Sequence, residues 1–179
     1  MNKPFTSESW DDINGIEIRS FEGLGPDKQL EIAYSVAAYT QARAATEKIV
    51  PVEPENILER QLARVAFKYD TLIGYVGASE PQPHQEFDMT RVGTLCVWPE
   101  YRGQNIGPRM LEDLTSAIRR RSQLAYAFCN PCSIRTFKGS HYVEAQPGEL
   151  PAGSASPYGN QAMIANKAPH STMRVRQLP

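Results

Sequence analysis

Apolar and polar residues alternate near the start of the chain and then change to a helical period. Residues 16–21 alternate in this way, which is typical of a strand with one buried face. Glycines and Pro26 interrupt the alternation, and the apolar residues then follow one face of a helix over residues 26–46. A second, shorter helical pattern covers residues 54–63, with Leu62 pointing inward. The first third of the chain therefore predicts one strand and two helices.

The middle of the chain contains three strand patterns. Residues 64–69 and 72–78 are separated by only two residues, and so short a connection predicts an antiparallel hairpin. Residues 79–89 are polar and contain two prolines, which predicts a loop. Residues 90–97 follow with a close-packed apolar content, which is typical of a strand that is buried on both faces.

The C-terminal half contains five further predicted elements. In chain order they are an amphipathic helix, a strand, a short helix and two strands, over residues 107–121, 124–129, 131–137, 141–145 and 161–166. Asn130 precedes the short helix and is a favoured N-cap residue. The whole order combines antiparallel neighbours with a β-α-β crossover. It therefore predicts a mixed α/β (α+β) sheet rather than a doubly wound one.

Composition and charge narrow the class of protein. The chain has 179 residues, of which 41% are hydrophobic and 22% charged, and its net charge is −1, as in an ordinary soluble domain. We expect one domain over residues 16–167, with a loose arm at 1–15 and a weakly ordered tail at 168–179. Neither nucleic acid nor membrane is an expected partner, because no strongly basic surface, membrane-length apolar run or signal peptide is recognisable. We expect a cytoplasmic monomer or homodimer.

The cysteine pattern gives no support for a disulfide framework or a metal site. The three cysteines are Cys96, Cys129 and Cys132, an odd number without regular spacing. Cys129 and Cys132 match Cys-x-x-Cys, but no second ligand pair completes a zinc site. We expect packed thiols and no metal.

The most informative segment joins the strand at 90–97 to the next helix. Its side chains are mostly small, so several backbone N–H groups can point at one guest. The helix that follows adds the positive end of its dipole, and together these features predict a site for phosphate or pyrophosphate. The residues expected to form this site are Arg102, Gly103, Gln104, Asn105, Ile106, Gly107 and Pro108.

The element order and this loop resemble the GCN5-related N-acetyltransferase (GNAT) superfamily. The acyl-CoA signature of that family, Arg/Gln-x-x-Gly-x-Gly/Ala, corresponds to Arg102 through Gly107. Asn105 stands where glycine is usual. Asparagine tolerates positive φ better than other residues with a side chain, so the turn remains compatible with it.

A second similarity lies downstream. The segment that begins at Asn130 resembles the family pattern Asn-x-x-Ala-x-x-Leu-Tyr-x-x-x-Gly-Phe. Phe137 replaces the tyrosine that often serves as general acid, and His141 replaces the glycine. The resemblance covers most of residues 16–167 and is most specific over 94–111.

The resemblance implies both a fold and a cofactor. The fold is a mostly antiparallel sheet of about six or seven strands with about four flanking helices, splayed between the fourth and fifth strands. Acyl-CoA lies in that gap, with its pyrophosphate on the loop 102–108. Along the pantetheine arm and the sulfur the resemblance places Leu95, Cys96, Val97, Asn130, Ser133 and Phe137.

The implied activity is the transfer of an acetyl group from acetyl-CoA to an amine of a small molecule or protein. The amine attacks the thioester directly, so the enzyme positions the reactants and removes a proton from the amine. The strand positions that some relatives use for the base hold Arg91 and Gly93, which cannot serve. The remaining candidate catalytic residues are Glu86 and Asp88, with His84 beside them and His141 further on, and, for protonating the thiolate, Ser133 or Tyr142.

Alternative interpretations stay open at this point. Glu86 and Asp88 suit a cationic acceptor, yet they also fit solvated loop residues. The departures at Asn105 and Phe137 are compatible with a catalytically weak GNAT-like module that binds acyl-CoA for regulation or interaction. A nucleotide-binding α/β protein is the least favoured interpretation, because the glycine spacings of its phosphate loops are missing.

Overall fold

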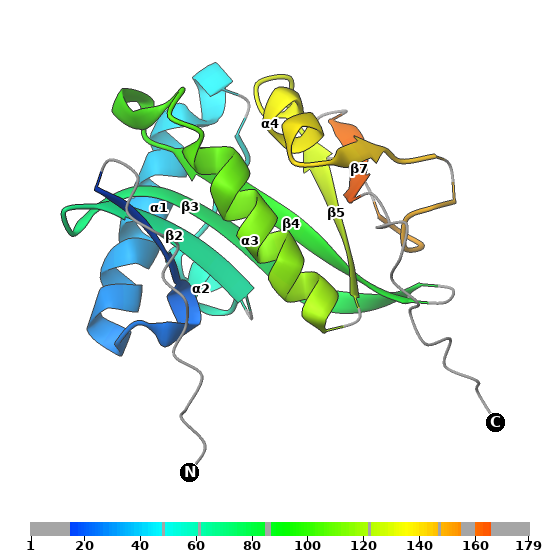
Figure 1. Ribbon diagram of the computed structural model, residues 1–179, viewed down its shortest axis with the longest axis horizontal. Coiled ribbons are helices and arrows are strands. Elements are labelled where there is room, and N and C mark those ends of the chain that lie inside the picture. The colour runs from blue at the N-terminus through cyan, green and yellow to red at the C-terminus, as the bar shows by residue number, and fades with distance from the viewer. Residues whose placement is uncertain are drawn as a thin grey trace, which may run out of the picture.

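A seven-stranded mixed sheet forms the centre of the computed structural model (Figure 1). The strands are β1 (Ile16–Ser20), β2 (Leu62–Lys68), β3 (Thr71–His84), β4 (Phe87–Val97), β5 (Gln123–Cys129), β6 (Tyr142–Glu144) and β7 (Gln161–Ala165). Their order across the sheet is β1-β2-β3-β4-β5-β7-β6. Only β4 and β5 run parallel, and every other neighbouring pair is antiparallel. The predicted mixed, mostly antiparallel fold is therefore confirmed.

The structure describes most of the chain between residues 15 and 165. The described ranges are 15–47, 49–60, 62–84, 87–121, 123–146, 148–154 and 160–165. The predicted tail at 168–179, residues 1–14 of the predicted arm and Glu86 lie outside them.

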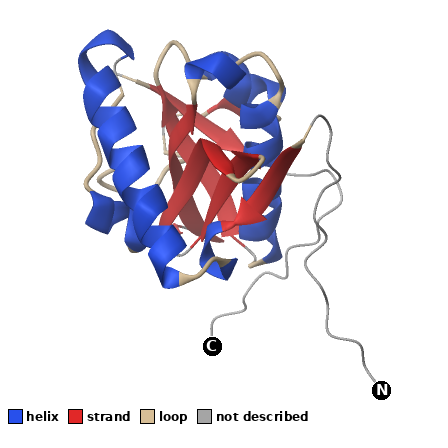
Figure 2. Cartoon of the chain, turned by 90° about the vertical axis from the view of Figure 1, so that its left-hand side faces the viewer, coloured by secondary structure: helices blue, strands red, loops and turns tan. Residues whose placement is uncertain are grey.

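Helices cover both faces of the sheet (Figure 2). The helical elements are α1 (Pro26–Glu47), α2 (Pro54–Leu58), α3 (Ile106–Arg120), α4 (Ile134–Gly139) and the short 3-10 turns η1 (Phe21–Gly23) and η2 (Pro99–Tyr101). On one face, Ile32 of α1 and Ile57 of α2 share an apolar cluster with Phe67 of β2. On the other, Leu114 of α3 shares a cluster with Val76 of β3. Within the described part of the chain, no helix is long and apolar enough to cross a membrane.

The second predicted helix is shorter than its pattern indicated. α2 ends at Leu58, and Leu62 belongs to β2, where it pairs with Ala78. The helix closes with a tightened turn, because Arg60 N–H donates to the Ile57 carbonyl at 3.2 Å. Pairing across the sheet has overridden a helical pattern of only three turns, and the predicted range 54–63 is corrected accordingly.

The predicted loop at 79–89 is in fact the far end of a long β3–β4 hairpin. β2 begins opposite Ala78, so beyond that residue β4 is the only strand among the described residues that pairs with β3. Proline has no N–H to donate, so Pro81 and Pro83 take positions whose backbone nitrogen points away from β4. Prolines that normally argue against a strand are tolerated here because that side of β3 has no partner strand.

β4 and β5 pair over only part of their length. Their parallel register runs from Asp88 opposite Gln123 to Val92 opposite Ala127. Beyond this point β5 pairs only with β7, and the last residues of β4 have no neighbour on that side. The splay between the fourth and fifth strands is confirmed. The prediction that this strand is buried on both faces is wrong, because Arg91 is exposed before the splay and residues 93–95 are partly exposed beyond it.

A buried arginine joins the sheet to the helix α3. Arg64 of β2 is 8% exposed, and its Nε donates to the carboxylate of Asp113 on α3. Its Nη1 donates to the Ala63 carbonyl at 2.8 Å and lies 3.6 Å from the Glu22 carboxylate. One guanidinium therefore holds β2, α3 and η1 together.

Loss of this guanidinium should cost stability. We expect Arg64→Ala to lower the free energy of unfolding by about 3 kcal/mol, because two carboxylates lose a buried partner. The exposed Arg121, replaced in Arg121→Ala, serves as the control and should change it by less than about 0.5 kcal/mol. Urea unfolding followed by circular dichroism measures both values, and equal losses in the two variants would contradict the anchoring role of Arg64.

Candidate active site

A β-bulge bends β4 where it parts from β5. Between the pairs that Gly93 and Cys96 make with β3, β4 contains one residue more than β3. Thr94 lies in this bulge with a φ of 56°, a left-handed conformation that β-branched residues rarely adopt. Thr94 and Leu95 line the cavity beside the splay.

The cavity has a volume of about 1010 Å³. Its walls come from the segment that runs from the end of α1 through α2 to Arg60, from β3, β4 and β5, from α4 and the turn before it, and from the connection between β6 and β7. Of the residues predicted to meet the cofactor arm, Leu95, Asn130, Ser133 and Phe137 line it. The volume is at the upper end for small-molecule sites, which are roughly 300–1,000 Å³.

The loop before α3, residues 102–108, has the backbone geometry of an anion site, and we call it the anion loop. Gly103 and Asn105 both adopt left-handed conformations, with φ of 78° and 60°. Asn105 is the N-cap of α3, and its carbonyl accepts from Arg109 N–H at 3.3 Å. Among the described residues, no acceptor is recorded for the backbone N–H groups of 103–107. These donors at a helix start are available to an anion.

Small and apolar residues hold the end of the anion loop against the core of the protein. Ile106 is 2% exposed and anchors the first turn of α3 in the core. A Cβ on Gly107 would lie 3.3 Å from the Thr136 methyl group, which is a tight contact, so a larger residue there would require the Thr136 side chain to shift. Pro108 lies in the first turn of α3, where a missing N–H costs no helical hydrogen bond.

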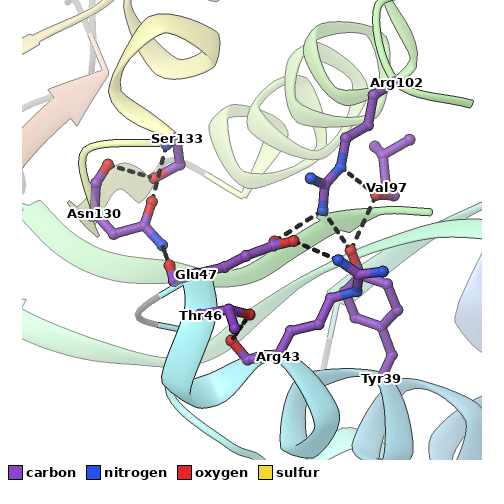
Figure 3. Close-up of polar contacts among 8 residues, drawn as sticks. All are labelled: Tyr39, Arg43, Thr46, Glu47, Val97, Arg102, Asn130 and Ser133. Atoms are coloured by element: carbon purple, nitrogen blue, oxygen red, sulfur yellow. Dashed lines mark hydrogen bonds and ion pairs between the residues drawn. The ribbon is translucent and has the colours of Figure 1, made fainter. Parts of the chain in front are cut away.

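The side chain of Arg102 turns away from the anion loop toward α1 (Figure 3). Its Nε donates to the Val97 carbonyl at 3.0 Å, and its Nη2 donates to the Tyr39 hydroxyl at 2.6 Å and to the Glu47 carboxylate at 2.8 Å. The Tyr39 hydroxyl itself donates to the Val97 carbonyl at 3.2 Å. The Val97 carbonyl, which the resemblance assigns to the pantetheine arm, therefore has two partners within the chain.

Asn130 connects the other side of the splay to the same end of α1. Its Nδ2 donates to the Glu47 carbonyl at 3.2 Å, and its Oδ1 accepts from Ser133 N–H at 2.9 Å. The second bond closes a turn over residues 130–133, and α4 begins at Ile134 instead of the predicted residue 131. Asn130 thus caps a turn before α4 rather than the helix itself.

Glu47 therefore contacts both sides of the splay. Its backbone carbonyl meets Asn130, and its carboxylate meets Arg102 and, at 2.6 Å, Arg43 (Figure 3). The five residues that make these contacts form a cluster that we call the clasp: Tyr39, Arg43, Glu47, Arg102 and Asn130. Tyr39 is held further by stacking on Trp98, with ring centroids 4.5 Å apart. The clasp thus links the ends of β4 and β5 through the end of α1.

The structure does not bring the predicted proton-transfer residues together. Asp88 is exposed at the start of β4, seven residues from Leu95, which corresponds to roughly 23 Å along a strand. His84 lies beside the same hairpin tip. Ser133 does line the cavity, and its hydroxyl donates to the Asn130 carbonyl at 3.1 Å.

Tyr142 points away from the cavity. Its hydroxyl shares a 2.8 Å hydrogen bond with Thr115 of α3, and burial raises the pKa of that hydroxyl. Phe137 packs edge to face on the Tyr142 ring, with centroids 5.0 Å apart, and so stands between the ring and the cavity that Phe137 lines. Tyr142 is therefore not in place to protonate a thiolate in the cavity.

The buried cysteines are packed thiols, as their sequence pattern suggested. Burial raises the pKa of Cys96 to about 12 and that of Cys129 to about 12, although a hydrogen bond with Ser133 opposes the shift at Cys129. Both stay protonated near neutral pH, and a protonated thiol is a poor nucleophile. Cys132 is exposed.

Sequence reasoning missed four charged residues of the cavity wall. These are Glu59, Arg60, Glu80 and Arg91. Glu59 and Arg60 were expected inside a helix, and Glu80 in a loop. Arg91 was noted only as a residue that cannot act as a base. No local signal identifies them, because their proximity arises from pairing between distant segments.

A comparison with protein families agrees with this geometry. The family model described as Acetyltransferase (GNAT) family matches residues 29–142, which is more than half of the chain. No curated protein matches the chain in sequence.

Solved structures share the fold at low sequence identity. A GNAT-family acetyltransferase from Staphylococcus aureus Mu50 has a TM-score of 0.65 at 14% identity, covering 84% of this chain and 98% of that one. N-acetylglutamate synthase from Neisseria gonorrhoeae, complexed with coenzyme A and N-acetyl-glutamate, has a TM-score of 0.61 at 16% identity, covering 84% and 34%. Arabidopsis thaliana Naa50, in complex with the bisubstrate analogue CoA-Ac-MVNAL, has a TM-score of 0.57 at 11% identity, covering 84% and 96%.

These structures share a mixed α/β fold with this chain, whose sheet opens beside β4. Because the family model covers residues 29–142, the chain belongs to the GNAT family of acetyltransferases.

The clasp should make stability depend on pH. Burial raises the pKa of Glu47, but hydrogen bonds from Arg102 and Arg43 outweigh it and hold the pKa below its usual value. Such a group stabilises the fold above its unfolded pKa of about 4.3 and loses this contribution as pH falls through the folded value. Thermal unfolding should therefore show the largest destabilisation by Glu47→Gln above about pH 5 and a shrinking difference below it.

Glu112→Gln is the matched control for this measurement. Glu112 is exposed on α3 and lies outside the clasp, so its replacement reports the general effect of removing one carboxylate. A Glu47→Gln difference that grows toward acid pH, or one equal to the control at every pH, would contradict the role assigned to Glu47.

Proposed function

We propose that the protein is an acyl-CoA-dependent N-acyltransferase that transfers acetyl from acetyl-CoA to an amine by direct attack. The observation that carries the proposal is the position of the anion loop, which follows the strand that opens away from β5 beside the cavity. Family membership supports it. So do the CoA-containing ligands named for the synthase and Naa50 structures.

The residues of the site fit an acyl-CoA. The unpartnered N–H groups of 103–107 are suited to the pyrophosphate, whose charge matches the positive end of α3. Leu95, Ser133 and Phe137 line the cavity where we place the thioester. The Asn130 side chain and the Val97 carbonyl bind the pantetheine arm once they give up their present hydrogen bonds to Glu47, Tyr39 and Arg102. Bound acetyl-CoA supplies an activated carbonyl carbon.

The chain must remove one proton from the attacking ammonium group. We assign this role to Glu80, which lines the cavity on β3 between the residues that pair with Val92 and Thr90. It lies much nearer the splay than Asp88 does. A carboxylate within reach of the amine, directly or through one water, is sufficient for such general base catalysis. Ser133 also lines the cavity, and we assign to its hydroxyl the transfer to the departing thiolate of the proton that the nitrogen loses on forming the amide.

A second candidate function is an acyl-CoA-binding module with weak catalysis. The observation in its favour is that Phe137 has no hydroxyl and that the Tyr142 hydroxyl is bonded to Thr115. Both functions require acyl-CoA binding, and they differ in whether thiol is released when an amine is added.

The anion loop should tolerate glycine at residue 105 but not a β-branched residue. Asn105→Gly retains the left-handed turn, so acetyl-CoA affinity should stay within about threefold of wild type. Asn105→Val cannot hold a φ near 60° without strain, and we expect affinity to fall at least about tenfold. Isothermal titration with acetyl-CoA measures both, and Gln104→Ala controls for loss of a loop side chain. Undiminished binding by Asn105→Val would remove the pyrophosphate assignment.

Proton removal by Glu80 should be visible in the kinetics. Glu80→Gln should lower kcat by about 100-fold or more at unchanged acetyl-CoA affinity, since the amide cannot accept the proton. Glu59→Gln, at another point of the cavity wall, should change kcat by less than about threefold. Thiol release from acetyl-CoA across a panel of amines provides the rate. Acetyl-CoA binding without thiol release for any amine would establish the binding module instead.

A further inference from the structure

Two arginines line the cavity without carboxylate partners. Arg60 follows the end of α2, Arg91 lies on β4, and both belong to the cavity wall. Within the described part of the chain, neither forms an ion pair with an acidic side chain. A cation in a partly desolvated place costs free energy unless an anion compensates it.

Arg60 is held in the cavity wall by a bond to the backbone of α2. It is half-buried, and its Nε donates to the Asn56 carbonyl at 3.2 Å. Burial lowers the pKa of Arg60, and the charge of Arg91 lowers it further. The two guanidinium groups therefore act on each other across the same space, and a shared anion would relieve that repulsion.

Arg91 is positioned by an aromatic ring. Its guanidinium carbon lies 5.4 Å from the centre of the Phe128 ring, a cation–π contact, and Phe128 also lines the cavity. Stacking on a ring leaves the edge of a guanidinium available, and that edge matches the two oxygens of a carboxylate. Arg91 is thus pre-oriented although its side chain is exposed.

The wall also contains carboxylates. Glu59 and Glu80 line the same cavity, so its charged residues comprise two anions and two cations. This balance does not suit a simple polyamine, for which acidic residues alone are expected. It suits a molecule that presents an ammonium group to Glu80 and an anion to the arginines.

We propose that the acceptor carries a carboxylate in addition to the reacting amine, as an amino acid or short peptide does, and that Arg60 and Arg91 bind this carboxylate. The proposal rests on the acyltransferase function above and names its substrate class. The amine nitrogen donates its electron pair to the thioester carbon, the carbon–sulfur bond breaks, and CoA leaves as a thiol with the proton that the amine lost. The carboxylate takes no part in the bond changes and fixes the amine in place.

The test compares acceptors that differ only in the carboxylate. The twenty L-amino acids and their primary amides are assayed for acetyl-CoA-dependent thiol release with the full-length protein. In parallel, N-acetyl-amino acids and N-acetyl-amino acid amides are titrated into protein saturated with CoA. We expect at least one amino acid to exceed its amide at least tenfold in kcat/KM, and the acid product to bind more tightly than its amide.

Substitution of the two arginines then tests whether they bind the carboxylate of the acceptor. Arg91→Gln and Arg60→Gln should each reduce the acid-to-amide ratio at least tenfold, by raising KM for the acid, while acetyl-CoA affinity stays unchanged. Arg91 is exposed, so its variant remains informative if Arg60→Gln fails to fold. Arg121→Gln, outside the cavity, should keep the wild-type ratio.

The outcomes separate this proposal from the broader function. Faster transfer to amides or to amines without a carboxylate would overturn the acceptor class and leave the acyltransferase intact. Acetyl-CoA binding with no preference for acids, in rates or in product binding, would also overturn it. Failure of acetyl-CoA to bind at all would instead remove the proposed function, and the acceptor class with it.

Discussion

The parting of β4 from β5 is the constraint on which the rest of the molecule depends. A parallel pair that stops at Val92 leaves backbone groups on two strand ends without a sheet partner. Buried backbone groups need hydrogen-bond partners, so the gap must be filled by side chains, solvent or a ligand. In this chain Glu47, at the end of α1, occupies part of the gap together with Arg102 and Asn130, which bind it. Affinity for a cofactor arm is therefore set by competition with bonds that already exist.

The same constraint explains why the cofactor side and the acceptor side of the site differ in character. The anion loop is built from backbone groups, so asparagine can replace glycine at residue 105 where the backbone is left-handed. The cavity wall, which contacts the acceptor in the proposed function, is built from side chains of distant segments. Charge in the wall is balanced within a short distance, with Arg60 and Glu59 adjacent in sequence. A domain can thus keep its cofactor site while its acceptor changes.

Much of the fold was predictable because the spacing of apolar residues along the sequence indicates its helices and strands. The strand at 16–20, the long helix α1 and the helix α3 follow their patterns closely. The helix α2 and the loop at 79–89 were misjudged because pairing with neighbouring strands, which no local pattern contains, decided both. The anion loop was recognisable from contiguous residues. The charged wall was not, since its members lie on three segments and meet only in the folded chain.

The prolines of β3 have a consequence beyond the geometry of the cavity. A strand with an unpaired side is a template on which another chain can add a strand of its own, and such contacts lead to aggregation. At Pro81 and Pro83 the unpaired side carries no N–H, so an incoming strand would find carbonyl groups without the alternating donors it needs. β3 can therefore extend beyond β2 as a wall of the cavity while remaining a poor partner for a second molecule.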